Sequence, residues 1–528
     1  MNNQAYESAA SLRPKHNPPV PLGALAQAAS LVPATPQDAA ALESLQATGL
    51  SVDSGDILPG EIFAALPGFN AHGARYAAQA VQAGAIAVVT DSQGAGIVAE
   101  TCPGTPVLLA SDPRAVVGPL AAEVYHHPSR HLVTTAVTGT NGKTTTSYFL
   151  DAILSAHLGA CMMAGTIELR VGRRSVESPR TTVEAPVLQR MLALALEEGV
   201  GAASLEASSH AIVLHRLDAT SIDIAGFTNL QRDHLDFHST MEEYLQAKAQ
   251  LFTPEHSSRG VVCVDDRWGA QLAAEAAIPV DRLRAYPGQT PADWWVTDAT
   301  VSLEEAATTF TLHGPDGEEI AASCPLPGLV NVQNAALALV MAIRAGVPTD
   351  TAVTALAGAH NIPGRMQRIS QRDGRRGLCI VDFAHTPDAM ELALAAVRPI
   401  TPGRLIVVFG SDGDRDQGKR PMLGEVCARL ADVLVVTDEN PRSEDPGLIR
   451  AAILEGVRSV RPGMENVEEI TTWRGDAVER GVELCGPDDT VIVTGKGHEP
   501  FLEAAGEFIR YNDAPVMAQA VEKKWGRP

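Results

Sequence analysis

A buried strand that runs directly into a glycine-rich turn is the feature that most constrains this sequence. The apolar run HLVTTAV ends at Val137, and TGTNGKTTT follows over residues 138–146. Such a turn before a helix points backbone N–H groups at one spot, where the helix N-terminus adds partial positive charge, so it binds phosphate. Lys143 is expected to reach the outer phosphates of a nucleotide, and the Thr144 hydroxyl to ligate Mg²⁺. The usual GxxxxGK(S/T) spacing would need a glycine at 137, where there is a valine, so the loop is shortened. An accidental Gly/Thr turn is the alternative.

Length and composition exclude several classes of protein. A chain of 528 residues predicts about three domains. A formal charge of −22, from 41 basic and 63 acidic side chains, argues against a nucleic-acid-binding surface. The seven cysteines show no CxxC spacing, which indicates reduced thiols in a cytoplasmic protein. No apolar run is long enough for a transmembrane helix, and residues 1–21 lack the apolar segment of a secretory signal. We expect those 21 residues to be a disordered tail, with a docked arm as the alternative.

The remaining sequence predicts an α/β protein of three domains. Residues 22–130 alternate short strands with Ala-rich helices, as expected of a small α/β domain. Residues 131–360 open with the phosphate loop and continue with helices and strands that predict a central P-loop-type domain with a mostly parallel sheet. Residues 361–528 alternate again, as in a C-terminal Rossmann-like α/β domain. Open parallel sheets bind ligands beyond the carboxyl ends of their strands, so polar residues there become candidates.

Polar residues follow two strands of the central region. Glu206 in SLEASSH is placed to hold Mg²⁺ beside the nucleotide, with a capping turn as the alternative. The dense segment FTNLQRDHLDFHSTMEEY indicates a site without fixing the roles of its residues. Lys248 lies on the next predicted helix, and taken alone it fits a surface lysine whose stem covers apolar neighbours.

Further polar residues follow the strands of the third region. Arg365 could neutralise phosphate, and Asp382 and His385 could contact a ribose or a base. Another set joins both charge signs to an amide and suits a zwitterionic amino acid: Asn440, Arg442 and Glu499. Ordinary turn residues are the alternative at each of these positions.

Taken in order, these motifs resemble those of the Mur ligases, in particular the branch that adds the third amino acid of the peptidoglycan peptide. The matches include TGTNGKTTT, EASSHAIVLHR, FTNLQRDHLDFHSTMEEYLQAKAQLF, NVQNAALAL, PGRM, DFAHTP, GDRDQGKRP, ENPRSEDP and GKGHE. The resemblance implies ATP- and Mg²⁺-dependent amide ligation to UDP-N-acetylmuramoyl-L-alanyl-D-glutamate. The three predicted domains would then bind the uridine nucleotide, ATP, and the amino acid together with ATP. A monomeric enzyme with small-molecule substrates is expected.

The resemblance also assigns site residues. It implies that Lys143, Glu206, His234 and a carbamylated Lys248 are catalytic, and that Thr144, Glu206, His234 and Lys248 ligate metal. The implied ATP contacts are Gly139, Thr140, Asn141, Gly142, Lys143, Thr144, Thr145, Asn334, Arg365, Asp382 and His385. The implied contacts to the UDP-muramoyl dipeptide are Ser54, Phe69, Asn70, Thr181, Thr182, Ser208 and Arg216. The implied amino-acid pocket consists of Arg415, Asn440, Arg442, Gly495 and Glu499.

The sequence ENPR resembles the DNPR signature of the enzymes that add meso-diaminopimelate. In those enzymes the arginine grips the distal carboxylate, a group that lysine and ornithine lack. Glu439 and Ser411-Asp412 depart from the family pattern close to this pocket, so L-lysine and L-ornithine remain alternatives. Gly55, His72 and Leu214 are further departures. More distant alternatives are a folylpolyglutamate- or cyanophycin-type ligase and a non-catalytic nucleotide-binding protein.

Overall fold

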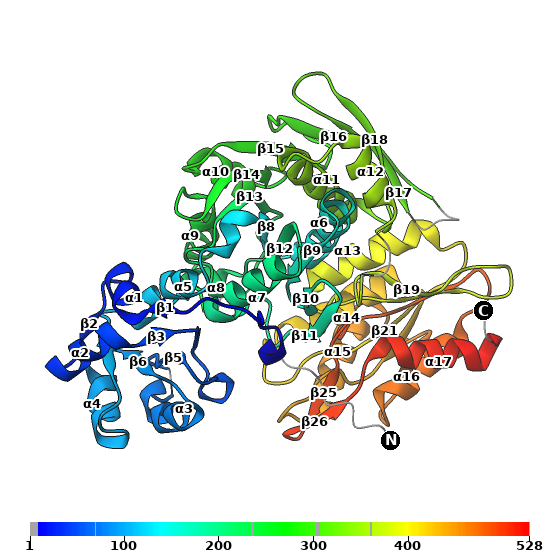
Figure 1. Ribbon diagram of the computed structural model, residues 1–528. Helices are drawn as coiled ribbons and strands as arrows, with labels where there is room; N and C mark the ends of the chain where they lie inside the picture. The colour runs from blue at the N-terminus through cyan, green and yellow to red at the C-terminus, as the bar shows by residue number, and fades with distance from the viewer. Residues whose placement is uncertain (1–8, 69, 234–236, 303–306, 360–361, 527–528) are drawn as a thin grey trace. The chain divides into compact units, whose positions relative to one another are not determined.

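The computed structural model describes residues 9–68, 70–233, 237–302, 307–359 and 362–526 (Figure 1). Their contacts separate into two units. The first contains residues 1–284, 288–295 and 336–355, and the second contains 285–287, 296–335 and 356–528. Helices and strands alternate through both units, so the predicted α/β class is confirmed.

The first unit begins with a small five-stranded sheet in the order β2-β7-β6-β5-β4. Strands β4 to β7 are parallel and β2 is antiparallel to its neighbour. The strands are β2 Val32–Pro33, β4 Gly49–Ser51, β5 Glu61–Ala64, β6 Ala87–Thr90 and β7 Val107–Leu109. The helices are α1 Leu22–Ala28, α2 Pro36–Ser44, α3 Ala77–Ala83, α4 Ser92–Thr101 and α5 Pro113–Val124.

The larger sheet of the first unit carries the phosphate loop. Among the described residues the sheet has eleven strands in the order β11-β10-β9-β12-β8-β13-β14-β15-β16-β17-β18, with β17 Thr308–His313 and β18 Glu319–Cys324 at its far edge. The strands from β9 to β16 in this order are parallel, and β10 and β11 form an antiparallel hairpin. The strands are β8 Val133–Thr138, β9 Cys161–Ala164, β10 Glu168–Val171, β11 Arg174–Glu177, β12 Ala202–Glu206, β13 Ile222–Phe227, β14 Ser257–Cys263, β15 Val280–Arg284 and β16 Trp294–Val301. The helices are α6 Lys143–Leu158, α7 Ala185–Glu197, α8 Ser209–Val213, α9 Met241–Ala249 and α10 Arg267–Glu275. Helices α11 Leu329–Arg344 and α12 Thr349–Ala357 follow later in the chain.

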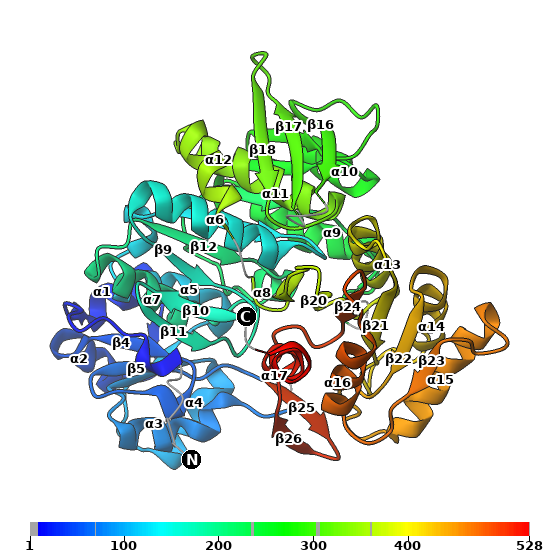
Figure 2. The same ribbon diagram turned by 90° about the vertical axis from the view of Figure 1, so that its right-hand side faces the viewer.

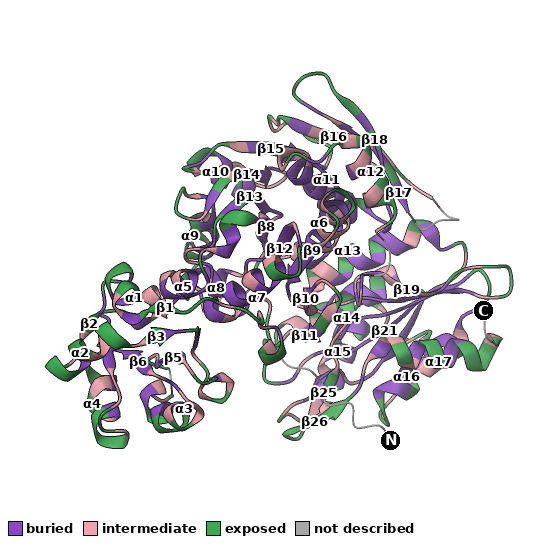
Figure 3. Cartoon of the chain, viewed as in Figure 1, coloured by how far each residue is buried: buried purple, intermediate pink, exposed green. Residues whose placement is uncertain are grey.

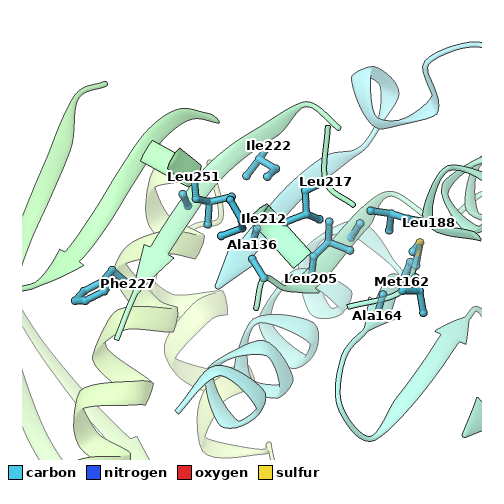
Figure 4. Close-up of a cluster of buried hydrophobic side chains, with 14 of the residues drawn as sticks. Ala136, Met162, Ala164, Leu188, Leu205, Ile212, Leu217, Ile222, Phe227 and Leu251 are labelled. Carbon is cyan, nitrogen blue, oxygen red and sulfur yellow. The ribbon is translucent and has the colours of Figure 1, made fainter. Parts of the chain in front are cut away.

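Apolar strands covered by helices build the core of this sheet. Ala136, Leu205 and Phe227 come from three adjacent strands and lie in one buried cluster with Leu188 of α7 (Figure 4). Strands that are buried on both faces have largely apolar sequences, and this is why β8 and β12 could be predicted from the sequence. The helices instead expose one face: α2 and α4 show long exposed stretches (Figure 3).

The segment before α1 differs from the predicted disordered tail, because residues 9–17 form a docked arm. Leu12 is fully buried in the core cluster of the larger sheet. The Arg13 guanidinium pairs with Asp56 and Glu61 of the small-sheet region. Arg190 of α7 pairs with the same Asp56 at 2.8 Å. The arm is ordered because it buries an apolar side chain and supplies a charge to two carboxylates, which outweighs its backbone entropy.

The second unit contains a six-stranded sheet in the order β19-β20-β24-β21-β22-β23, parallel except for β19. Helices α16 and α17 lie on one side of this sheet and α14 and α15 on the other (Figure 2). The strands are β19 Gln367–Ser370, β20 Leu378–Val381, β21 Leu405–Phe409, β22 Val433–Val436, β23 Val467–Glu469 and β24 Thr490–Val493. The helices are α13 Pro387–Val397, α14 Lys419–Leu430, α15 Pro446–Val460, α16 Arg474–Leu484 and α17 Asp513–Trp525. Two hairpins complete the unit: β17 Thr308–His313 with β18 Glu319–Cys324, and β25 Phe501–Ala504 with β26 Glu507–Arg510.

Candidate active site

The phosphate loop joins β8 to α6. Its backbone is held by hydrogen bonds with the residues that follow the neighbouring strand β13. Gly139 and Gly142 have φ of 143° and 90°, a region that L side chains rarely adopt. A Cβ at Gly139 would stand 1.9 Å from the Thr228 hydroxyl. Asn141 donates from its backbone N–H to the Asn229 side chain at 3.1 Å, and its carbonyl accepts from Thr228 at 2.6 Å. The loop is therefore rigid before any phosphate arrives.

Two lysines converge on one carbonyl of this loop. Lys143 Nζ and Lys248 Nζ each donate to Gly139 O at 3.0 Å. Lys248 is only 1% exposed and lies 4.3 Å from the centre of the Tyr244 ring. Burial, together with the nearby Lys143 charge, lowers the pKa of Lys248 well below its ordinary value. Lys248 is thus a buried amine inside the site, and the surface position expected from its neighbours alone is wrong.

Glu206, the last residue of β12, connects the phosphate loop with Thr166, which follows β9. Its Oε2 accepts hydrogen bonds from the hydroxyls of Thr144 and Thr166, both at 2.9 Å, while Oε1 accepts from Thr166 N at 2.8 Å. The side chain is 1% exposed. A buried carboxylate and two hydroxyls at a phosphate loop form the hard oxygen donor set that Mg²⁺ prefers. Among the described residues no cluster of three or more His, Cys, Asp or Glu could hold a metal, and His234 lies outside them.

The residues predicted to hold the muramoyl dipeptide lie next to Glu206. The Thr182 hydroxyl donates to Glu206 O at 2.6 Å and accepts from Ser208 N at 3.1 Å. Arg216 donates to Thr182 O at 3.2 Å and pairs with Glu184 at 3.0 Å. The Thr166 and Thr181 hydroxyls are 3.2 Å apart. The structure thus brings Thr181, Thr182, Ser208 and Arg216 together beside the loop.

Two other predicted dipeptide contacts, Ser54 and Asn70, lie in the region of the small sheet. The Ser54 hydroxyl donates to Gln79 Oε1 at 3.1 Å, and Asn70 is exposed. Phe69 lies outside the described residues. Nothing in these contacts distinguishes a uridine site from an ordinary surface, so their roles stay predictions.

The second unit places Arg365, Asp382 and His385 together after β20. Asp382 accepts from Met366 N at 2.8 Å and Ala384 N at 2.9 Å, and burial raises its pKa. The Arg365 guanidinium stacks 4.4 Å from the centre of the Phe383 ring, and the Phe383 and His385 rings are 4.8 Å apart. A flat cation and two rings suit a nucleotide base or its phosphates. Asn334, the other predicted nucleotide contact in this unit, is a buried residue of α11.

The predicted amino-acid pocket lies at the carboxyl edge of the same sheet. Asn440 Nδ2 donates to Asp412 Oδ1 at 3.0 Å and to Glu499 Oε2 at 3.1 Å. Arg442 Nη2 lies 3.8 Å from Asp412 Oδ2. These residues follow β21, β22 and β24, which are adjacent, so parallel pairing brings their ends together. Arg415 is an exposed residue of the loop before α14.

Buried groups that the sequence reasoning did not identify support this pocket. Lys496 is fully buried and donates to Asn440 Oδ1 at 2.8 Å and Glu499 Oε2 at 2.9 Å. Arg474 and Asp513 form a fully buried ion pair at 2.8 Å behind it. The sequence feature that could have pointed to Lys496 is its place in the motif GKGHE.

Glu439 is buried, and no ion pair joins its carboxylate to a cation among the described residues. It is 3% exposed, and its Oε2 has no hydrogen-bond partner in the part of the chain that the structure describes. A Cβ on Gly495 would lie 2.4 Å from that oxygen, so only glycine fits there. Burial, and then the charge of Asp412, raises the pKa of Glu439 to about 8.

Comparison with known proteins gives this geometry a family. The Mur ligase family catalytic domain matches residues 46–123, the Mur ligase middle domain 137–342, and the Mur ligase glutamate ligase domain 364–497. A Streptomyces coelicolor protein, UDP-N-acetylmuramoyl-L-alanyl-D-glutamate--2,6-diaminopimelate ligase, is 44% identical over 483 residues, 92% of this chain and 94% of its own. The chain belongs to the Mur ligase family.

Two further proteins are similar to this Mur ligase over most of its length. A Leifsonia xyli UDP-N-acetylmuramyl-tripeptide synthetase is 42% identical over 89% of this chain and 91% of its own. A solved structure of a UDP-N-acetylmuramoyl-L-alanyl-D-glutamate--2,6-diaminopimelate ligase has a TM-score of 0.64 at 32% identity, covering 91% of this chain and 95% of its own. The three matched domains fall within the predicted ranges 22–130, 131–360 and 361–528, whose boundaries stay predictions.

Two other expectations bear on the environment of this Mur ligase. In the described part of the chain, no helix is long and apolar enough to cross a membrane. All seven cysteines are unpaired, and all except the half-buried Cys102 are buried. Burial therefore shields six of the seven thiols from solvent.

Proposed function

We propose that this Mur ligase uses ATP to add meso-2,6-diaminopimelate to UDP-N-acetylmuramoyl-L-alanyl-D-glutamate, as an enzyme of the MurE type. The observation that supports this proposal most strongly is the group of side chains at the phosphate loop: Lys143, Lys248, Thr144 and the buried Glu206 beside Thr182 and Ser208. It joins a phosphate cradle to the residues predicted to hold the dipeptide, so an anionic acceptor and a nucleotide phosphate can meet there.

The reaction then has two steps. A carboxylate oxygen of the D-glutamyl residue attacks the γ-phosphorus of ATP, and ADP leaves. The amino group of the incoming residue attacks the carbonyl carbon of the acyl phosphate, loses a proton and expels phosphate. This chain's residues act mainly by positioning and by neutralising charge. Lys143 would move from Gly139 O to the phosphates, and the loop N–H groups would bind the same oxygens.

Magnesium fits the residues present. Thr144 and Glu206 would hold one ion, and His234 with a carbamylated Lys248 would hold a second. The bound metal supplies charge neutralisation between two anions. Carbamylation is supported by the low pKa of Lys248, because a neutral amine adds CO₂ to give a carbamate and a proton. The carbamate would present oxygens where the lysine alone presents a donor.

Phosphate release is the test of the proposed function. We expect it to require ATP, Mg²⁺, the UDP-muramoyl dipeptide and a diamino acid together, since each step consumes the product of the one before. A coupled phosphate assay with each component omitted in turn checks this. ATP hydrolysis that proceeds equally well without the dipeptide would contradict the ligase and favour a nucleotide-gated binding protein.

We base the proposed preference for meso-diaminopimelate on the surroundings of Arg442. The Arg442 side chain is 21% exposed, and its guanidinium lies 3.8 Å from Asp412, which also accepts from Asn440. Its planar fork can bind a carboxylate through two N–H groups. L-Lysine and L-ornithine lack the distal carboxylate and would leave this cation without its partner.

A side-by-side assay tests that choice. We expect wild-type enzyme to prefer meso-diaminopimelate over L-lysine and L-ornithine by about a hundredfold in kcat/KM, and Arg442→Ala to lose most of that preference. The matched control is Arg429→Ala, because Arg429 is an exposed arginine at the end of α14. Wild-type preference for lysine would refute the role of Arg442 and leave the ligase reaction intact.

We further propose a monomeric cytoplasmic enzyme. The ATP it consumes and its reduced, buried thiols support the compartment.

A further inference from the structure

The hairpin β25–β26 makes contacts that reach into the predicted amino-acid pocket. Its strands pair from Phe501↔Arg510 to Ala504↔Glu507. The two turn residues, Ala505 and Gly506, have φ of 50° and 79°, the left-handed pair of a tight two-residue turn. The outer strand β26 is exposed along its whole length. The hairpin therefore has one exposed strand, β26, and one strand, β25, that contacts the rest of the unit.

The inner strand fixes the backbone of Arg442. Arg442 N donates to Glu503 O at 3.0 Å, and Ala505 N donates to Arg442 O at 2.6 Å. Arg442 has a φ of 54°, a left-handed conformation that a non-glycine residue rarely adopts. These two hydrogen bonds hold that conformation, which determines where the side chain leaves the backbone.

Glu503 contacts two polar residues of the predicted pocket, Asn440 and Arg442. Its backbone N–H donates to Asn440 Oδ1 at 3.2 Å, and its Oε2 lies 3.4 Å from Arg442 Nε. Asn440 Oδ1 also accepts from Lys496, and Asn440 Nδ2 donates to Asp412 and Glu499, so the side-chain amide is held in one orientation. Glu503 thus helps to set the orientation of an amide and a guanidinium at once.

The charge arrangement leaves Arg442 able to bind a ligand. Glu503 lies near Nε and Asp412 lies 3.8 Å from Nη2, yet Nε makes no hydrogen bond within the described residues. Neither carboxylate therefore forms the two-pronged pairing that would occupy the guanidinium. Glu503 anchors the cation from its Nε side, and Nη1 and Nη2 can still take a carboxylate.

We propose that the β25–β26 hairpin selects the incoming amino acid, with Glu503 as the positioning residue that aims Arg442 and Asn440 at it. This inference rests on the proposed function and adds a determinant outside the residues assigned to the pocket. The hairpin acts through the backbone of Glu503 and Ala505, and the Glu503 carboxylate adds orientation of the guanidinium.

The test is Glu503→Ala, which removes the carboxylate and keeps both backbone contacts. We expect the KM for meso-diaminopimelate to rise about fivefold to tenfold, with kcat changed less than about twofold. The preference for meso-diaminopimelate over L-lysine should fall by a similar factor. The KM for ATP and the thermal midpoint should stay at wild-type values, which a merely structural role would not predict.

Glu507→Ala is the matched control, because Glu507 is a glutamate on the exposed strand of the same hairpin, and it should behave as wild type. An unchanged or lowered KM in Glu503→Ala would overturn the proposal, since a lowered KM means that Glu503 competes with the ligand for Arg442. A loss of thermal stability with a raised KM for ATP would also overturn it. Wild-type enzyme with no diamino-acid-dependent phosphate release would instead overturn the proposed function.

Discussion

Lys248→Ala is expected to abolish ligase turnover, with a loss of about a thousandfold or more, because the buried amine at the phosphate loop disappears. Alanine offers no nitrogen to which CO₂ can add, so added bicarbonate should not restore activity. Phosphate release under saturating substrates measures the loss. Unimpaired turnover would show that Lys248 only fills space beneath the loop.

Two further measurements separate chemistry from folding in that variant. Lys523→Ala is the control, because the Lys523 side chain is 70% exposed, and it should retain full activity. A thermal melt should show that Lys248→Ala still folds. Wild-type enzyme incubated with ¹³C-labelled CO₂ should show a carbamate carbon signal that the Lys248→Ala variant lacks.

Glu439→Gln is expected to remove a pH-dependent loss of stability. The folded-state pKa of Glu439, about 8, lies above the value of about 4.3 expected in an unfolded chain. Between these values the unfolded carboxyl ionises while the folded one keeps its proton, so rising pH favours unfolding. Stability linked to this proton is complete below about pH 4 and is lost as the pH rises through about 8.

The size of the effect follows from the same shift. From pH 5 to pH 8, wild type should lose about 3 kcal/mol of unfolding free energy relative to Glu439→Gln, as an order of magnitude. The charged groups that act on Glu439 are Asp412, Glu499, Lys419 and Arg474, and all remain in the variant. Urea unfolding at several pH values measures the difference. Glu507→Gln, an exposed control, should parallel wild type, and parallel curves for Glu439→Gln would refute the raised pKa.

Much of the fold was predictable because parallel strands are apolar throughout. The strand expected to end at Val137 is β8, Val133–Thr138, and the helix expected within MEEYLQAKAQLF is α9, Met241–Ala249. The ends of such strands are where polar residues gather, so Glu206, Asp382 and Asn440 were found by position. The family resemblance was needed for four residues that nothing local marked: Thr181, Thr182, Ser208 and Arg216.

What escaped prediction depends on contacts between distant segments. The burial of Lys248 arises from Gly139 O, which lies 109 residues earlier in the chain. Glu503 lies in a short hairpin whose outer strand is exposed, and no apolar alternation marks its role. The order of residues 9–17 depends on Asp56, Arg190 and Glu197, which the composition of the arm does not reveal.

The docked arm has a consequence for the order of events during synthesis. The backbone N–H groups of Lys15 and His16 donate to Glu197 at 2.7 and 3.1 Å, and Arg190 donates to Ala9 O at 2.8 Å. At usual translation rates of about 5–20 residues per second, some ten seconds or more separate the arm from these partners. The small sheet can therefore form while the first segment of the chain is still undocked, and the arm closes only after α7 has left the ribosome.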